Sequence, residues 1–286
     1  MSGLRQWLAS GPLITDGAWG TELQARGLEP GAAPDTWNLT HPDRVEAVAR
    51  AYAEAGSQAI LTNTFRANAI AMKGDLEAIN RAGVEISKRA AAGRALVFAS
   101  IGPTGKMLMA GEITSEQART AFDAQAAALA SAGADALLVE TMSDIEEARL
   151  AVAAAKSTGL PVIVSFAFDS GKNKDRTMMG STPEAVAAAM VEAGADAVGA
   201  NCGVGVEYGA AICRRLKAAC DLPIWIKPNA GLPKVDGAAV RYDTTADFFA
   251  SHLAALRDAG ASFIGACCGS TPDFIRALVK ARCASS

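Results

Sequence analysis

Several features are scarce in this sequence of 286 residues, and each absence excludes a class of protein. No apolar stretch reaches the roughly 18 to 20 uncharged residues of a membrane span, because Gly, Asp, Glu or Arg interrupts every one. No run of Lys or Arg is present and the formal net charge is −3, so neither nucleic acid nor a membrane surface is expected as a partner. The first ten residues lack a long apolar core and a signal cleavage site, so we expect a soluble, cytoplasmic protein.

Histidine is also scarce. Only His41 and His252 are present, and neither follows a predicted strand, so we expect surface or helix-capping roles for both. Catalysis by a Ser/His/Asp triad is therefore poorly supported. The six cysteines are expected to be reduced in the cytoplasm, where metal binding, catalysis or simple burial is more common than disulfide formation.

What the sequence does contain is an internal repeat. Four times an Ala-rich helical stretch ends at a glycine and leads into an apolar strand, and these glycines are Gly56, Gly133, Gly194 and Gly260. Four more apolar runs bring the predicted strands to eight: residues 13–15, 95–100, 161–166 and 223–227. Helical segments separate the strands, for example residues 42–55, 115–132, 144–157, 182–193 and 245–259.

Strict alternation of strands and helices predicts a parallel sheet. Eight such units in 286 residues fit a (β/α)8 barrel, and we expect one domain over residues 1–286. A doubly wound sheet has fewer strands, and no G-x-G-x-x-G follows the first strand.

Active sites of such barrels lie at the carboxyl ends of the strands. The residues that follow the predicted strands are polar or contain sulfur, and they include Asp16, Gly17, Thr62, Asn63, Thr64, Glu140, Cys202, Lys227, Asn229, Cys267 and Cys268.

Three of these residues are cysteines, which are suitable ligands for Zn²⁺. The alternative is that they are buried free cysteines. Cys267 and Cys268 are adjacent, so they can share a metal only if the strand ends or bulges there, and Gly269 favours such a break. The other three cysteines are predicted to be bystanders: Cys213 and Cys220 on a buried helix face, and Cys283 in a frayed tail.

A zinc ion with three thiolates activates water weakly but can hold a fourth thiolate that must stay nucleophilic. This favours alkylation of a thiol substrate. Asp16 and Glu140 could then bind the ammonium group of an amino acid, and the alternative for both is a capping or salt-bridge role.

The sequence also resembles the zinc-dependent homocysteine S-methyltransferases along nearly its whole length. The motifs that carry this resemblance are, in order, DGAWGTELQARG, NTFRAN, ASIGPTG, VETMSDIEEA, GANCGVG, KPNAGLP and GACCGSTPDFI. The resemblance implies a (β/α)8 fold and makes Cys202, Cys267 and Cys268 the zinc ligands, with the homocysteine thiol as the fourth.

The resemblance also implies that Asp16, Gly17 and Glu140 hold the amino and carboxylate groups of homocysteine, with help from the backbone around residues 62–64. The NAGLP phrase is similar to the methionine synthase branch, in which the residue matching Asn229 can fill the open position of the zinc. Thr141 stands where betaine-using members have Tyr, which disfavours that branch.

The methyl donor stays open, because the sequence ends just after the predicted eighth helix, without the folate and cobalamin domains of methionine synthase. A methylated corrinoid protein, or a small sulfonium or quaternary ammonium compound, is expected instead. The pairs Met107/Met109 and Met178/Met179 would either line a donor-facing surface or fill the core. Three alternatives remain: a methyltransferase for another thiol, a zinc-holding subunit active only with a corrinoid partner, and a lyase that forms a Schiff base at Lys227.

Overall fold

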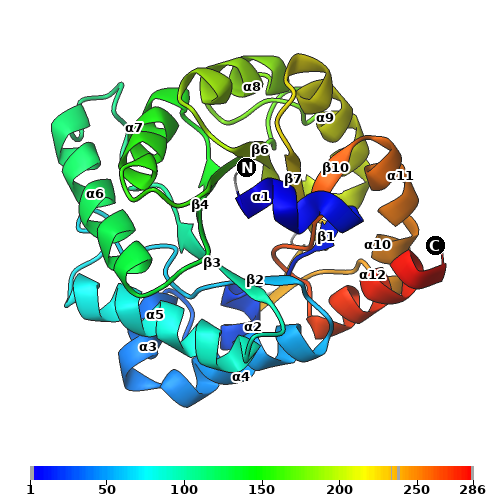
Figure 1. Cartoon of the computed structure of the whole chain (residues 1–286), viewed down its shortest axis with the longest axis horizontal. Coiled ribbons are helices and arrows are strands. Elements are labelled where there is room, and N and C mark those ends of the chain that lie inside the picture. The colour runs from blue at the N-terminus through cyan, green and yellow to red at the C-terminus, as the bar shows by residue number, and fades with distance from the viewer. Residues whose placement is uncertain (1–2, 233, 237–238, 285–286) are drawn as a thin grey trace.

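Eight parallel strands form a ring at the centre of the molecule (Figure 1). The computed structural model describes residues 3–232, 234–236 and 239–284. The strands of the ring are β1 (Leu13–Ile14), β2 (Ala59–Leu61), β3 (Leu96–Ile101), β4 (Ala136–Met142), β5 (Val162–Phe166), β6 (Ala197–Gly205), β7 (Ile224–Asn229) and β10 (Ala261–Ile264). Their order is β1-β10-β7-β6-β5-β4-β3-β2, and a parallel bridge from Thr15 to Ala59 joins its two ends. The predicted (β/α)8 barrel is confirmed.

Helices surround the ring. They are α2 (Gly20–Gln24), α3 (Trp37–Thr40), α4 (Pro42–Glu54), α5 (Leu76–Ala91), α6 (Ser115–Ser131), α7 (Ile145–Lys156), α8 (Pro183–Glu192), α9 (Val206–Ala219), α10 (Ala246–Ser251), α11 (Leu253–Asp258) and α12 (Pro272–Ala284). Helix α1 (Gly3–Trp7) crosses one end of the barrel (Figure 1). The chain also has two 3₁₀ turns, η1 (Leu8–Ser10) and η2 (Pro34–Thr36), and a hairpin of β8 (Lys234–Asp236) and β9 (Ala239–Arg241). None of the helices in the described ranges combines the length and apolarity needed to cross a bilayer.

The helix ends follow the local sequence signals. Thr182 accepts a hydrogen bond from the backbone of Ala185 at the start of α8, with Pro183 in the first turn. The four glycines of the repeat, Gly56, Gly133, Gly194 and Gly260, all adopt the positive φ that a left-handed residue after a helix requires.

Two predictions about helices are wrong. The segment 245–259 forms two helices, α10 and α11, instead of one. In a continuous helix the backbone N–H of His252 would donate to the carbonyl oxygen of Phe248. The Nδ1 of the His252 ring lies 2.9 Å from that oxygen and competes for it. The backbone N–H of His252 donates instead to Phe249. Cys283 lies in the last turn of α12 rather than in a frayed tail, although it is exposed.

Side chains on the inward face of the strands form two layers. A lower layer, near the amino ends of the strands, is apolar and comprises Leu13, Ala59, Leu61, Phe98, Ala136, Leu138, Ile163, Ala197, Trp225 and Phe263, closed below by Leu4 of α1. Side chains alternate along a strand, so the inward positions nearer the carboxyl ends form an upper layer. That layer is polar and comprises Ser100, Glu140, Ser165, Asn201 and Lys227.

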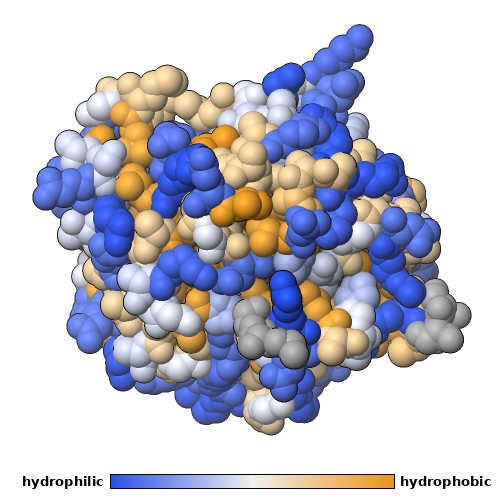
Figure 2. Space-filling model, turned by 45° about the horizontal axis from the view of Figure 1, so that its top comes forward, coloured by the Kyte–Doolittle hydropathy of each residue, from blue (hydrophilic) through white to orange (hydrophobic). Residues whose placement is uncertain are grey.

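The outer surface is mixed, and Figure 2 shows hydrophilic and hydrophobic residues interspersed over one face. Met107, Met109 and Met178 are exposed by 42%, 77% and 66%, which excludes the core-filling alternative for these three. Met179 is half-buried.

Candidate metal and substrate site

Three cysteine sulfurs meet at the carboxyl end of the barrel. Strand β7 lies between β6 and β10 in the ring, so Cys202 of β6 and the loop after β10 stand on either side of it. The Sγ of Cys202 lies 2.8 Å from that of Cys267 and 3.9 Å from that of Cys268, and all three lie within 4.8 Å of one another. The structure thus brings together the three cysteines proposed as ligands.

The adjacent cysteines can face one site because the strand has already ended. Strand β10 stops at Ile264, and Gly269 adopts a φ of +83° just after the pair. The backbone N–H of Cys267 donates to the carbonyl of Pro228 at 2.7 Å, and this bond fixes the loop against β7. The predicted break in the strand is confirmed.

Left-handed backbone at two strand ends marks the site as strained. Cys202 has a φ of +54° and Thr141, on β4, a φ of +62°. Such conformations cost about 1 to 3 kcal/mol for residues other than glycine and concentrate at functional sites. Gly203 also has positive φ, and a Cβ there would lie 2.6 Å from the carbonyl oxygen of Phe168.

The chemistry of the cluster fits a soft cation. Thiolates bound to zinc at about 2.3 Å in a tetrahedron stand about 3.8 Å apart. The sulfurs of Cys202 and Cys268 are 3.9 Å apart, whereas those of Cys202 and Cys267, at 2.8 Å, would have to separate to bind the same ion. Hydrogen bonds from Cys202 and Cys267 lower the pKa of Cys268 to about 3, whereas hydrogen bonding to Cys267 and Cys268 raises the pKa of Cys202. The cluster therefore holds one negative charge readily and needs a cation to hold three.

No second group of this kind exists among the described His, Cys, Asp and Glu side chains. Cys213 is buried in α9, as predicted, and Cys220 is half-buried just after it. The histidines lie outside the cluster: His41 precedes α4 and His252 joins α10 to α11.

A cavity of about 310 Å³ opens beside the cluster. Of the predicted site residues, Gly17, Thr62, Asn63, Glu140 and the three cysteines line it. β2 and β6 are four places apart in the ring of eight, as are β4 and β10. The residues after β2 therefore face Cys202 across the barrel, and Glu140 of β4 faces Cys267 and Cys268.

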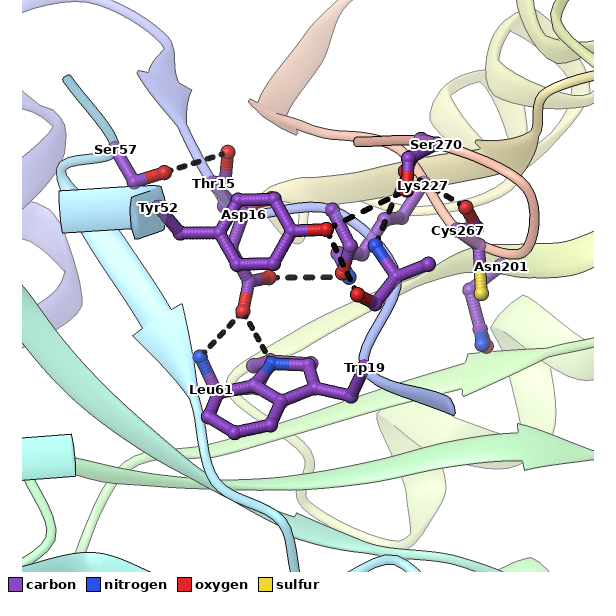
Figure 3. Close-up of polar contacts among 12 residues, drawn as sticks. Thr15, Asp16, Trp19, Tyr52, Ser57, Leu61, Asn201, Lys227, Cys267 and Ser270 are labelled. Carbon is purple, nitrogen blue, oxygen red and sulfur yellow. Dashed lines mark hydrogen bonds and ion pairs between the residues drawn. The ribbon is translucent and has the colours of Figure 1, made fainter. Parts of the chain in front are cut away.

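Three predicted site residues do not line the cavity. Asp16 is fully buried, and its Oδ2 accepts hydrogen bonds from Trp19 Nε1 at 2.7 Å and from the backbone of Leu61 at 2.8 Å (Figure 3). Its Oδ1 lies 3.0 Å from Lys227 Nζ. Thr64 stands behind the wall, where its hydroxyl donates to the carbonyl of Ser100 at 2.7 Å.

Asn229, the last residue of β7, is the third. Its Nδ2 donates to the carbonyl of Gly203 at 3.4 Å. Its Oδ1 is buried and has no hydrogen-bond partner in the described part of the chain. A buried acceptor without a partner is costly, so this oxygen beside the cysteine loops is available to a cation or a donor that enters the site.

Glu140 provides a carboxylate on the cavity wall. Burial raises its pKa to about 7, opposed in part by the positive charge of Lys227. Its oxygens accept hydrogen bonds from Ser100 Oγ at 2.5 Å and from Asn201 Nδ2 at 3.3 Å. A cationic ligand group placed here would favour the charged carboxylate.

Sequence reasoning missed other residues of the cavity. These are Ser100, together with Trp19, Asp35 and Arg66 on the side of β1 and β2. Thr141, which the sequence placed at the end of its strand, lines the cavity as well. Asp35, in η2, accepts a hydrogen bond from the backbone of Arg66 at 2.8 Å, and burial raises its pKa to about 6. Ser100 carried a usable signal, because it lies two residues after the inward-facing Phe98.

Comparison with known proteins agrees with this geometry. Residues 13–282 match the family described as homocysteine S-methyltransferase. Methionine synthases from Mycobacterium leprae and Mycobacterium tuberculosis are each 32% identical to this chain, over 98% and 94% of it. The chain spans about a quarter of their length.

Among solved structures, the metallated homocysteine methyltransferase MmuM from Escherichia coli superimposes with a TM-score of 0.81. It is 26% identical in sequence, and the match covers 98% of this chain and 99% of that one. By the family match and the 32% identity, this chain belongs to the homocysteine S-methyltransferase family.

Proposed function

We propose that this protein transfers a methyl group to the sulfur of homocysteine and so forms methionine, with Zn²⁺ held by Cys202, Cys267 and Cys268. The observation that carries the proposal is the meeting of three sulfurs and the Glu140 carboxylate around one cavity of about 310 Å³. In the transfer, the homocysteine sulfur forms a bond to the methyl carbon. The bond from that carbon to its donor breaks, and the electron pair leaves with the donor.

The three thiolates would be the protein ligands of the zinc. The bound zinc would supply a position for a fourth sulfur and keep that sulfur deprotonated near neutral pH. Before substrate arrives, the unpartnered Oδ1 of Asn229 is the proposed occupant of that position. A site of this kind needs reduced thiols, which agrees with action in the cytoplasm.

The remaining residues bind and orient the amino acid. Glu140 lies across the barrel from Cys267 and Cys268 and is proposed to hold the substrate ammonium group. Gly17, Thr62 and Asn63 line the cavity beside it and are proposed to position the carboxylate. Asp16 would act indirectly, since its carboxylate is engaged by Trp19, Leu61 and Lys227.

The donor is proposed to approach from the rim of the barrel. Met107 and Met109 in the loop after β3, Met178 in the loop after β5 and Leu232 after β7 are exposed there. A methylated corrinoid protein would dock on this rim, whereas a small sulfonium or quaternary ammonium donor would enter the cavity.

The lyase alternative receives no support. Lys227 Nζ donates to the carbonyl of Gly17 at 2.8 Å and is paired with Asp16. Burial alone would lower the pKa of Lys227, but the nearby carboxylate of Asp16 raises it above the usual value. A lysine that stays protonated is a poor nucleophile.

The proposal is tested by metal analysis and a donor screen. We expect one zinc per chain and methionine formation from homocysteine with methylcobalamin, S-methylmethionine or betaine as the donor. Cys202→Ala should lose the zinc and lower the rate at least about 10³-fold, because the site loses a ligand. Cys213→Ala, which removes a buried cysteine outside the cluster, should keep both.

Two results would reject the proposal: no zinc in the wild type, or full activity in Cys202→Ala. Turnover with a small donor alone would contradict the alternative that the chain is only a zinc-holding subunit for a corrinoid partner. A screen of other thiols at fixed donor concentration would show whether homocysteine is the preferred acceptor.

A further inference from the structure

Lys227 occupies a singular place in the barrel. It lies on β7, between the two strands whose carboxyl ends lead to the cysteines, and it shares the inward face with Trp225 below and Asn229 above. Its side chain is 2% exposed. Among the described residues it is the only buried Lys, Arg or His.

Two contacts hold the ammonium group in place. Nζ donates to the carbonyl oxygen of Gly17 at 2.8 Å and lies 3.0 Å from Asp16 Oδ1 (Figure 3). Asp16 is itself fixed by Trp19 and Leu61. An ammonium group has three N–H donors, so these two partners leave one for the cavity.

The ion pair of Lys227 and Asp16 has a defined orientation relative to the cavity. Lys227 lines the cavity together with Glu140 and the three cysteines, whereas Asp16 does not. The pair therefore presents its positive end to the site.

We propose that Lys227 is a positioning residue that stabilises the substrate sulfur as a thiolate, by supplying the fixed positive charge that a buried and increasingly negative centre requires. This inference rests on the proposed function. Three thiolates already outweigh a divalent cation, and a fourth adds another negative charge in a site removed from water. A cation already held by Asp16 and Gly17 needs no reorganisation when that charge arrives.

This role predicts a difference between substrate and product. Homocysteine and methionine share their ammonium and carboxylate groups, but only homocysteine binds as a thiolate, while the sulfur of methionine is neutral. Removing the charge of Lys227 should weaken the binding of homocysteine and leave that of methionine nearly unchanged. A unit charge several ångströms away in a partly screened interior corresponds to a loss of roughly 30-fold in affinity.

The experiment is calorimetric titration of the zinc-loaded protein with L-homocysteine and with L-methionine. In Lys227→Met we expect homocysteine affinity to fall roughly 30-fold and methionine affinity to change less than about threefold. Lys227→Arg, which keeps the charge, should recover most of the loss. Zinc content and melting temperature are measured on each variant.

Lys227→Met leaves Asp16 buried without its partner, so Asp16→Asn/Lys227→Met is tested as well. This neutral pair avoids the unpaired carboxylate and should show the same selective loss for homocysteine if it folds and binds zinc. Equal weakening of both amino acids, or no weakening of either, would overturn the role of Lys227 while leaving the proposed function intact. A wild type that binds zinc but not homocysteine would overturn both.

Discussion

The lower and upper layers of the barrel interior lie on the same strands and on the same inward face, yet they differ in chemistry. In the lower layer, the rings of Phe98, Trp225 and Phe263 pack with centroids 5.4 to 6.2 Å apart. In the upper layer, nearer the carboxyl ends of the strands, hydrogen bonds join Ser100, Glu140, Ser165 and Asn201.

This difference separates stability from function within one barrel. The lower layer contributes apolar burial, which is large and not directional. The upper layer contributes side chains that are costly to bury unless each finds a partner, and in return it aims polar groups at the cavity. Substitutions in the lower layer should therefore reduce stability first, whereas substitutions in the upper layer should reduce binding first.

The largest expected effect is that of Phe98→Ala in the lower layer. Phe98 is fully buried and its ring contacts Trp7 of α1, Trp225 and Phe263. We expect a loss of about 3 to 5 kcal/mol in the free energy of unfolding, because the substitution removes apolar contacts and leaves a cavity. Urea denaturation measures this loss, and zinc content and homocysteine affinity of the remaining folded protein should stay close to wild type.

Phe98→Leu removes less volume and should cost less. If Phe98→Ala abolished homocysteine binding while the protein stayed folded, the two layers would not be separable.

The next largest effect is a gain in stability. In the metal-free protein, we expect Glu140→Gln in the upper layer to raise the free energy of unfolding, by somewhat less than Phe98→Ala lowers it. Glu140 keeps its proton up to a pKa of about 7 in the folded chain, against 4.5 for the ordinary group. The folded state thus binds more protons than the unfolded state between these pH values, and the stability that Glu140 contributes is lost as pH rises from 4.5 to 7.

Gln stays neutral, so Glu140→Gln should become more stable than wild type by up to about 3 kcal/mol at pH 8 and by much less at pH 5. Urea denaturation of both proteins at the two pH values gives the difference. Homocysteine affinity should fall in the same variant, because the proposed partner of the substrate ammonium group is lost. A stability difference that does not depend on pH would contradict the assignment.

The sequence predicts the strands and most residues of the candidate site, but it does not predict how the buried polar side chains pair. Apolar runs that follow glycines predict the strands, since a helix end and a buried strand both leave strong local signals. The fold rule that places sites at strand ends then selects the three cysteines and Glu140. What these signals do not contain is which side chains pair with one another across the strand ends.

Asp16 illustrates the missing part. Its pairing with Lys227 joins residues more than 200 positions apart in the sequence, and depends on β1 and β7 each adjoining β10. The sequence left Asp16 either as a ligand of the substrate ammonium group or in a capping or salt-bridge role, and the structure shows it buried in an ion pair with Lys227. Ser165 was missed for another reason: like Ser100, it lies two residues after an inward-facing apolar residue, Ile163, but it does not line the cavity, and its role appears only through its partner, Asn201.

The smallest expected change in stability is that of Asn201→Ala. Asn201 Oδ1 accepts hydrogen bonds from the backbone of Thr141 at 2.8 Å and from Ser165, while Nδ2 donates to Thr141 Oγ1 at 2.7 Å and to Glu140. Asn201→Ala removes all four bonds and the support for the left-handed backbone of Thr141. We expect a loss of about 1 to 3 kcal/mol by urea denaturation, together with weaker binding of homocysteine, since Glu140 loses one of its two hydrogen-bond donors.

Ser165→Ala is the matched control, because it removes only one of those four bonds. Asn201 Oδ1 would still accept from Thr141, and its Nδ2 bonds to Thr141 and Glu140 would be untouched, so the loss should stay below about 1 kcal/mol and homocysteine affinity should not change. If Ser165→Ala lowered the free energy of unfolding as much as Asn201→Ala, the loss of one hydrogen bond in the upper layer would weaken the others. That layer would then be as cooperative as the packed layer below it, and the contrast between them would lie only in the chemistry of their contacts.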